Sequence, residues 1–185
     1  VDFMSEYNKY YQKRDFFGKP YPELLEYINR FDITNKIIDL GCGQGRDVIA
    51  FGRMGFTVMG IDISDVGINQ LNEIVRKENL SVTTAVMDYK TYKNLLDYDI
   101  VLMNSMFHFY KNDIEEETKS LYWVLNEIKA KAKLILFVQE SKSRINLIKK
   151  ILMDMDLVIS IELEKSILYE EFNSKFYFFV IRKAK

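Results

Sequence analysis

The sequence predicts an α/β fold with a doubly wound, mainly parallel sheet of seven strands. Three observations support this prediction. Short apolar runs alternate with segments of helical periodicity along the 185 residues, which is typical of parallel strands connected by helices. The first of these runs ends in three alternate glycines before a helix begins. The last two runs follow one another without a helical pattern between them, which favours an antiparallel pair of C-terminal strands.

Length and composition favour a single domain. A chain of 185 residues suits one domain, since about 100–200 residues usually form one. Only two prolines occur, Pro20 and Pro22, and no long polar linker interrupts the chain. We therefore expect one domain over residues 1–185, with a helical lid over residues 1–31 and the sheet with its helices over residues 32–185.

Charge and cysteine content limit the class of protein. With 26 basic and 27 acidic residues the formal net charge is −1, so the chain lacks the overall positive field that attracts nucleic acid or an anionic membrane. No apolar run approaches the roughly 20 residues that span a bilayer. Cys42 is the only cysteine, which fits a reducing compartment. We expect a cytoplasmic monomer or homodimer with no nucleic-acid or membrane partner.

The N-terminal region is predicted to be helical and aromatic. Phe3, Tyr7, Tyr10, Tyr11 and Arg14 recur at helical spacing with an aromatic face, and residues 16–21 form an aromatic turn. Pro22 is suited to a helix start and precedes a short amphipathic helix that extends to about Phe31. The aromatic face would either pack on the core or form a lid and acceptor wall.

The rest of the chain supplies strands and helices in alternation. Aliphatic and aromatic runs predict the strands, and apolar residues three or four positions apart predict the helices. Ser64 can cap the helix that follows the second strand. The predicted strands cover residues 37–40, 57–62, 81–86, 99–103, 133–138, 157–163 and 175–182. The predicted helices cover residues 47–54, 114–128 and 143–153, with one more after Ser64.

Polar residues stand at the ends of the first four predicted strands. They are Asp39, Asp62, Asp88 and Asn104. In an open α/β sheet, ligands bind outside the carboxyl ends of the strands. One acidic residue at a strand end is usually solvated or a cap, but four polar ends in the same position predict a ligand site.

The spacing of the glycines separates two classes of cofactor. Residues 41–45 have the pattern G-x-G-x-G, and Arg46 stands where the dinucleotide fingerprint G-x-G-x-x-G has its third glycine. A pyrophosphate-binding turn is therefore disfavoured. Asp62 lies 21 residues after Gly41, close to the gap of about 20 residues that separates a glycine turn from the carboxylate that binds ribose hydroxyls. The pattern favours a ligand that contains a nucleoside.

At these residues the chain resembles the class I S-adenosylmethionine-dependent methyltransferases. The resemblance rests on residues 38–45 and 60–64, with weaker agreement at 87–89 and 98–101. Residues 44–47 and 16–21 are similar to small-molecule members related to tellurite-resistance and thiopurine methyltransferases. The resemblance implies S-adenosylmethionine as the cofactor, S-adenosylhomocysteine as the product, and methyl transfer to a small-molecule acceptor.

The resemblance also implies a role for each residue of the cofactor site. The glycines would pass close to the methionine part, with Asp39 near its ammonium group or holding the loop, and Cys42 would be a small residue of the turn. Asp62 would accept from the ribose hydroxyls and Ile63 would pack on the adenine. Asp88 would accept from the adenine amino group, with Tyr89 beside the ring. The implied cofactor-binding set is Asp39, Gly41, Cys42, Gly43, Gly45, Asp62, Ile63, Asp88, Tyr89 and Asn104.

His108 and Asn104 are the candidate catalytic residues. Methyl transfer from a sulfonium mainly requires alignment and removal of water, and it requires a base only if the acceptor arrives protonated. His108 is the only histidine and lies four residues after Asn104, where a base could reach the acceptor. Packing among aromatic residues is the alternative role for His108.

The candidate acceptor pocket is aromatic, because aromatic faces attract a cationic sulfonium and can enclose a planar acceptor. It consists of Tyr11, Phe17, Tyr21, Met106 and His108. Core packing is the alternative for some of these rings. A metal site is not expected, because one histidine and one cysteine leave only carboxylates as ligands.

Other functions stay open at this point. An NAD(P)-dependent oxidoreductase shares the fold class, but the glycine spacing disfavours it. A non-catalytic S-adenosylmethionine-binding regulatory protein would show the same cofactor motif without an acceptor pocket. A nucleic-acid or protein methyltransferase is disfavoured by the near-neutral charge.

Overall fold

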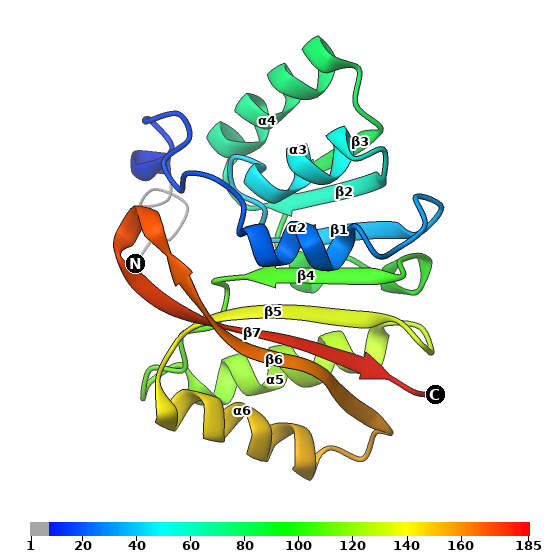
Figure 1. Cartoon of the computed structure of the whole chain (residues 1–185), viewed down its shortest axis with the longest axis vertical. Coiled ribbons are helices and arrows are strands. Elements are labelled where there is room, and N and C mark those ends of the chain that lie inside the picture. The colour runs from blue at the N-terminus through cyan, green and yellow to red at the C-terminus, as the bar shows by residue number, and fades with distance from the viewer. Residues whose placement is uncertain (1–7) are drawn as a thin grey trace. The chain divides into compact units, whose positions relative to one another are not determined.

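The computed structural model describes residues 8–185, and within them it contains a mixed sheet of seven strands. Figure 1 shows these strands with the helices that connect them. Phe3 and Tyr7 of the predicted aromatic helix lie outside the described residues. The prediction of a mainly parallel seven-stranded sheet with an antiparallel C-terminal pair is confirmed. The chain divides into two compact units, residues 1–93 and 94–185. The single domain predicted for residues 1–185 stays a prediction.

The first unit is built on three parallel strands in the order β3-β2-β1. Apolar side chains of the central strands are buried, with Ile37, Ile38 and Ile61 fully enclosed. Two helices of this unit contact β2. The elements are α2 (Pro22–Ile28), β1 (Lys36–Leu40), α3 (Arg46–Arg53), β2 (Thr57–Asp62), α4 (Asp65–Glu78), β3 (Val82–Val86) and the short 3-10 turn η1 (Tyr89–Thr91).

Local sequence signals account for the ends of these helices. Pro22 begins α2, as predicted, but the helix ends at Ile28 and single turns follow to Phe31. Ser64 caps α4 as predicted, because its side chain accepts a hydrogen bond of 3.0 Å from the Gly67 N–H. Asn79, in the left-handed conformation, ends α4.

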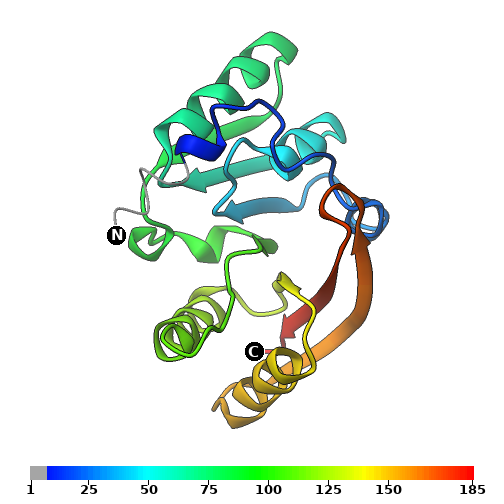
Figure 2. The same ribbon diagram turned by 90° about the vertical axis from the view of Figure 1, so that its left-hand side faces the viewer.

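The described N-terminal residues are not a continuous helix. Residues 8–10 are helical and the chain then runs through turns to residue 17, so the predicted helical course through Tyr11 to Arg14 is wrong. The cause is long-range, because side chains of the glycine loop and of α4 bind the backbone here, as shown below. Figure 2 shows this segment, in dark blue, beside α4 and the ends of β1 and β2.

The second unit contains two parallel strands followed by a long antiparallel hairpin, in the order β4-β5-β7-β6. Its elements are η2 (Leu95–Asp97), β4 (Ile100–Asn104), α5 (Ile114–Glu127), β5 (Lys133–Gln139), α6 (Lys142–Asp154), β6 (Ile159–Tyr169), η3 (Glu170–Phe172) and β7 (Ser174–Lys183). A register shift between Ile161 and Leu163 marks a bulge in β6.

The hairpin is longer than predicted because aromatic and aliphatic packing continues along β7. Phe178, Phe179 and Val180 are fully buried, and the rings of Phe137 and Phe178 stack with centroids 4.6 Å apart. The strand predicted over residues 175–182 is confirmed; within it Phe178 to Ile181 are buried, and Phe176 and Tyr177 are half-buried. None of the described helices is long and apolar enough to cross a membrane.

Candidate functional site

The loop between β1 and α3 carries the three alternate glycines. Gly41, Gly43 and Gly45 have φ values of 83°, 54° and 80°, a region that residues with a Cβ rarely adopt. The N–H groups of Gly41 and Cys42 both donate to the Ile61 carbonyl, at 2.7 and 2.9 Å, so β2 anchors the loop. Gly45 is the N-cap of α3. The strand, glycine turn and helix start are therefore present at the predicted residues.

Asp62 is the last residue of β2, and its side chain binds the backbone of the glycine loop. Its carboxylate accepts from the N–H of Gly43 and from the N–H of Ser64, each at 2.8 Å. The side chain is almost fully buried, and this burial raises the pKa of Asp62, although both N–H groups act in the opposite direction. An ionised carboxylate has about four acceptor positions. Asp62 can therefore still accept hydrogen bonds from the hydroxyl groups of a ligand.

Asp39 is the most unusual charged residue of the described chain. It lies in β1, is 2% exposed, and its Oδ1 atom has no hydrogen-bond partner among residues 8–185. Burial raises the pKa of Asp39 well above its ordinary value, the charge of Asp47 raises it further, and Arg46 lowers it. An unsatisfied buried carboxylate is costly. A cation or an N–H donor from a ligand would relieve that cost.

Arg46 and Asp47 connect the loop to the N-terminal segment. The guanidinium of Arg46 forms two hydrogen bonds with the Asp47 carboxylate, at 2.9 and 3.2 Å, and donates to the Phe17 carbonyl at 3.3 Å. It also lies over the Tyr21 ring, 4.9 Å from the centroid. Arg46 is thus held by the protein itself. The glycine spacing and the resemblance of residues 44–47 do not indicate these contacts of Arg46.

The aromatic residues of the predicted acceptor pocket divide between the two units. In the first unit, Tyr11 and Tyr21 are buried, and the Tyr11 and Phe17 rings make an edge contact with centroids 6.1 Å apart. A Cβ at Gly43 would lie 2.4 Å from the Tyr11 hydroxyl, so Tyr11 is packed directly on the glycine loop. The structure therefore brings Tyr11, Phe17 and Tyr21 to this loop.

The remaining cofactor candidates of the first unit lie near the strand ends. Ile63 and Tyr89 are half-buried. Asp88 is exposed and accepts from the Lys90 N–H at 2.9 Å, which makes it the cap of η1. The Cys42 sulfur would lie 3.0 Å from a Cβ at Gly60, and burial raises the pKa of its thiol well above the ordinary value. Cys42 is therefore a neutral packing residue of the turn.

The loop after β4 in the second unit contains Asn104, Met106 and His108. The Asn104 Oδ1 accepts from the Ser105 hydroxyl at 3.1 Å, and Met106 is half-buried. The His108 ring stacks on Tyr110 with centroids 5.5 Å apart. Asn104, Met106 and His108 are neighbours in this loop, and their relation to the glycine loop stays a prediction.

Two charged side chains fix the backbone of the loop after β4. Glu117 of α5 accepts from the N–H groups of His108, at 3.0 Å, and of Phe109. Arg144 of α6 donates from Nε to the His108 carbonyl at 2.6 Å. Phe109 has a φ of 49°, which is uncommon for a residue with a Cβ. No local sequence pattern indicates these contacts, because they join residues that are 8 to 36 positions apart.

Within residues 8–185 the structure shows no group of three or more His, Cys, Asp or Glu side chains that could hold a metal ion. The chemistry available at the glycine loop is that of buried carboxylates, backbone N–H groups and aromatic faces.

Comparison with known proteins identifies the family. Residues 3–120 match the family model described as tellurite resistance protein TehB. The chain belongs to the TehB family. The predicted resemblance to class I S-adenosylmethionine-dependent methyltransferases of the tellurite-resistance type is thereby confirmed.

A curated relative supports the same family. The Haemophilus influenzae protein named probable S-adenosyl-L-methionine-dependent methyltransferase TehB is 32% identical over 105 residues. The match covers 54% of this chain and 37% of that protein. The chain thus matches little more than a third of the length of this relative.

Solved structures show the same fold. The 1,6-didemethyltoxoflavin-N1-methyltransferase of Burkholderia thailandensis, solved with 1,6-didemethyltoxoflavin and S-adenosylhomocysteine, is 13% identical, with a TM-score of 0.74 and coverage of 100% of this chain and 86% of that chain. An rRNA methylase of Streptococcus thermophilus is 10% identical, with a TM-score of 0.64 and coverage of 88% and 95%. At these identities the likeness concerns the fold alone. The Rossmann-like methyltransferase fold predicted for this TehB-family chain is confirmed.

Replacing Asp39 with Asn should make the ligand-free protein less sensitive to pH. Burial raises the pKa of Asp39 above its unfolded value of about 4. Asp39 therefore binds its proton more tightly in the folded state than in the unfolded state. The contribution of this bound proton to stability is lost as the pH rises from about 4 through the folded pKa. Asp39→Asn removes the charge at nearly constant size. We therefore expect the free energy of unfolding of the variant, relative to wild type, to increase with pH.

Urea unfolding between about pH 4 and pH 8 measures this difference. Asp97→Asn, at an exposed position of the second unit, is the control for the exchange of Asp for Asn. A constant difference between Asp39→Asn and wild type across this range would show that the buried carboxylate does not set the pH dependence.

Replacing Glu117 with Ala should destabilise the second unit. The change leaves the N–H groups of His108 and Phe109 without their carboxylate acceptor, and a hydrogen bond to a charged group contributes about 1.5–3 kcal/mol. Glu116→Ala is the matched control, because Glu116 is exposed and pairs with Lys119 on the surface. Urea unfolding should show a clear loss for Glu117→Ala and little change for Glu116→Ala; equal effects would argue against the contact.

Proposed function

We propose that this TehB-family chain binds S-adenosylmethionine at the glycine loop and transfers its methyl group to a small-molecule acceptor. The observation that carries the proposal is the buried Asp39 carboxylate, whose Oδ1 has no hydrogen-bond partner among residues 8–185. S-adenosylmethionine has two positive groups, an ammonium and a sulfonium, and either would compensate a buried negative charge. The curated relative named as a probable methyltransferase supports this assignment.

The residues of the first unit fit the two ends of that cofactor. Gly41, Gly43 and Gly45 expose backbone where a Cβ would obstruct a ligand, and they would contact the methionine part beside Asp39. Asp62 keeps acceptor capacity for the ribose hydroxyls after binding the Gly43 and Ser64 N–H groups. At the adenine end, Ile63 and Tyr89 would contact the ring and Asp88 would accept from its amino group.

The same electrostatics disfavour an NAD(P) site. A pyrophosphate group at the glycine loop would lie near Asp39, a buried carboxylate that keeps an oxygen without a hydrogen-bond partner among residues 8–185. Arg46, the cation that follows the loop, is bound to Asp47 and to the Phe17 carbonyl. A dinucleotide would therefore meet negative charge without compensation, whereas a cationic ligand meets attraction.

When bound, S-adenosylmethionine supplies a methyl group that is already activated on a sulfonium. The protein therefore has to hold both reactants in line and exclude water. We assign the acceptor side to Tyr11, Phe17, Tyr21, Met106 and His108, with Asn104 bordering it. The imidazole of His108 would accept the proton of a protonated acceptor, and Glu117 and Arg144 fix the backbone that carries this ring.

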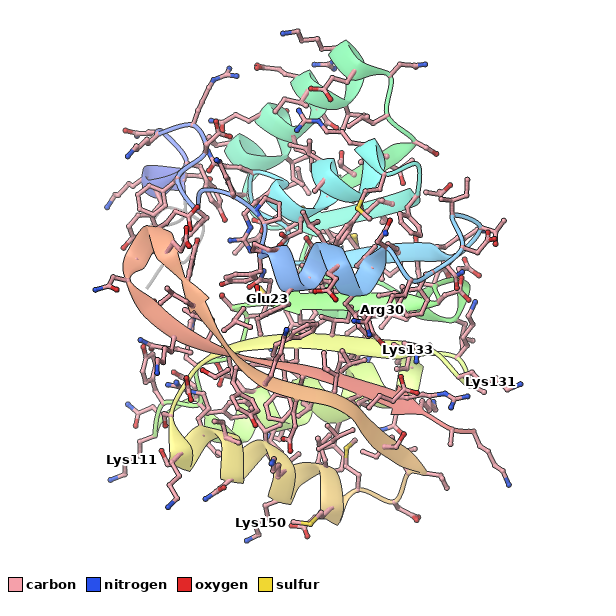
Figure 3. The ribbon with its side chains drawn as sticks, in the orientation of Figure 1. Glu23, Arg30, Lys111, Lys131, Lys133 and Lys150 are labelled. Atoms are coloured by element: carbon pink, nitrogen blue, oxygen red, sulfur yellow. The ribbon has the colours of Figure 1, made fainter. Side chains whose placement is uncertain are left out.

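A small-molecule acceptor is favoured over nucleic acid by the charge of the chain. The formal net charge is −1, whereas a nucleic-acid site neutralises several phosphates with Lys and Arg. Figure 3 shows Lys111, Lys131 and Lys150 on separate elements of the second unit, each directed outward. These three lysines do not form one patch. The lone Cys42 fits the reducing cytoplasm that we propose as the location.

Calorimetric titration with S-adenosylhomocysteine and with NADH tests the cofactor. We expect heat of binding with the first ligand and none with the second. Asp62→Ala should weaken S-adenosylhomocysteine binding by about 1–3 kcal/mol, because the ligand loses a buried acceptor. Asp97→Ala, at an exposed position of the second unit, is the control and should bind as wild type does. Absence of binding by the wild-type protein would refute the proposal, and unchanged affinity of Asp62→Ala would refute the ribose assignment.

A screen of thiols, amines, phenols and oxyanions for S-adenosylhomocysteine release identifies the acceptor class and then tests His108. With a protonated acceptor, His108→Ala should lower kcat by about 10²–10⁴-fold, while the affinity for S-adenosylhomocysteine stays the same. With a soft anionic acceptor, no base is needed and the effect should be small. Full activity of His108→Ala on a phenol or an amine would leave this ring with a packing role.

A further inference from the structure

The segment from Asn8 to Phe17, here called the strap, takes its shape from side chains of other elements. Its backbone is helical only over residues 8–10 and then turns. Two glutamine side chains bind three of its backbone groups. Gln44 accepts from the Phe16 N–H at 3.0 Å and donates to the Lys13 carbonyl at 2.9 Å. Gln70 donates to the Tyr11 carbonyl at 2.7 Å.

The two glutamines are also bonded to each other, and together they form the amide clasp. The Gln44 Nε2 donates to the Gln70 Oε1 at 2.7 Å. A carboxamide has two donors and one acceptor group, so it can bind a carbonyl, an N–H and another amide at once, which a carboxylate cannot. Gln44 lies within the glycine loop and Gln70 on α4. The amide clasp therefore connects three separate parts of the first unit.

The strap covers the glycine loop through Tyr11. Its hydroxyl would lie 2.4 Å from a Cβ at Gly43, and its ring 3.2 Å from a Cβ at Gly67. Glycine at both positions therefore leaves the space that the Tyr11 side chain fills. The N–H of Gly43 is bound to Asp62, so Tyr11 packs on the same loop to which we assign the methionine part of the cofactor.

Other contacts hold the strap nearer its two ends, including the hydrogen bond from Arg46 to the Phe17 carbonyl. Arg14 pairs with Glu73 at 2.7 Å, but both side chains are more than half exposed, and such pairs usually contribute little. Asn8 accepts from the Ser64 hydroxyl at 2.5 Å near the start of the strap. The amide clasp, by contrast, binds the middle of the strap at half-buried side chains.

We propose that Gln44 and Gln70 are positioning residues that keep the strap closed over the bound cofactor and so determine its residence time. This inference rests on the proposed function. A ligand beneath an ordered segment dissociates only when that segment opens, and loss of its hydrogen bonds increases the open population. Gln70 then affects the cofactor only through the strap.

Surface plasmon resonance with S-adenosylhomocysteine measures this effect on residence time. Gln70→Ala should increase the dissociation rate constant by about 3–10-fold, the equivalent of one lost neutral hydrogen bond. Gln12→Ala is the matched control, because Gln12 is a glutamine of the same strap with an exposed side chain. Gln70→Glu is a second variant: it keeps the size and the acceptor for Gln44 but cannot donate to the Tyr11 carbonyl, so it should also dissociate faster.

Trypsin cleavage after Lys13 and Arg14, both exposed in the strap, gives a readout that a general loss of stability would not reproduce. We expect S-adenosylhomocysteine to protect these sites in the wild-type protein and in Gln12→Ala, and to protect them less in Gln70→Ala. Without ligand, Gln70→Ala should be cleaved faster at these sites, while its midpoint of urea unfolding stays close to that of wild type.

The outcomes separate this proposal from the proposed function. If the wild-type protein does not bind S-adenosylhomocysteine, the proposed function fails, and faster cleavage of ligand-free Gln70→Ala still supports the amide clasp. If the wild-type protein binds, and both Gln70 variants match it in dissociation rate and in cleavage, the amide clasp is refuted alone.

Discussion

The hydrogen bond from the Gly43 N–H to the Asp62 carboxylate is the interaction on which the site depends. The same carboxylate binds the Ser64 N–H, so one buried group fixes the glycine loop and the start of α4 at the end of β2. Gly43 makes this bond at a positive φ, and the space that its missing Cβ leaves is filled by Tyr11. The positions of the glycine loop, of α4 and of the strap therefore all depend on Asp62. We expect a substitution of Asp62 to alter the packing of all three.

This arrangement concentrates negative charge in a small buried volume. Asp47 is compensated by Arg46, but Asp39 keeps an oxygen without a partner among the described residues. Burial and the neighbouring charge of Asp47 raise the pKa of Asp39 well above its ordinary range, which means that the folded protein is penalised for its ionised form. Departures from full polar satisfaction occur where a ligand completes the structure. A cationic cofactor would stabilise the ionised form of Asp39, and this attraction would contribute to its binding.

Much of the fold follows from local sequence signals, whereas the contacts that shape the site do not. The alternating strands and helices, the Ser64 cap and the glycine loop all follow from residues adjacent in the chain, and they are present as predicted. The helix expected beyond Tyr11 fails because Gln70, 59 positions away, binds the Tyr11 carbonyl. Glu117 and Arg144 were missed for the same reason. Helical periodicity indicates which side chains face the core. It does not show that the side-chain amide of a distant residue binds a backbone carbonyl that a helix would otherwise use.

The loop that carries His108 is supported partly from outside the range that matches the TehB family model. The residues assigned to the cofactor all lie within residues 3–120, the range that matches the TehB family model. The loop that carries His108 is held by Glu117, inside that range, and by Arg144 of α6, outside it. The backbone position of His108 is therefore set in part by Arg144, which lies outside the matched range. The TehB family match therefore does not extend to every contact that holds the His108 loop, and the acceptor has to be established for this chain by experiment.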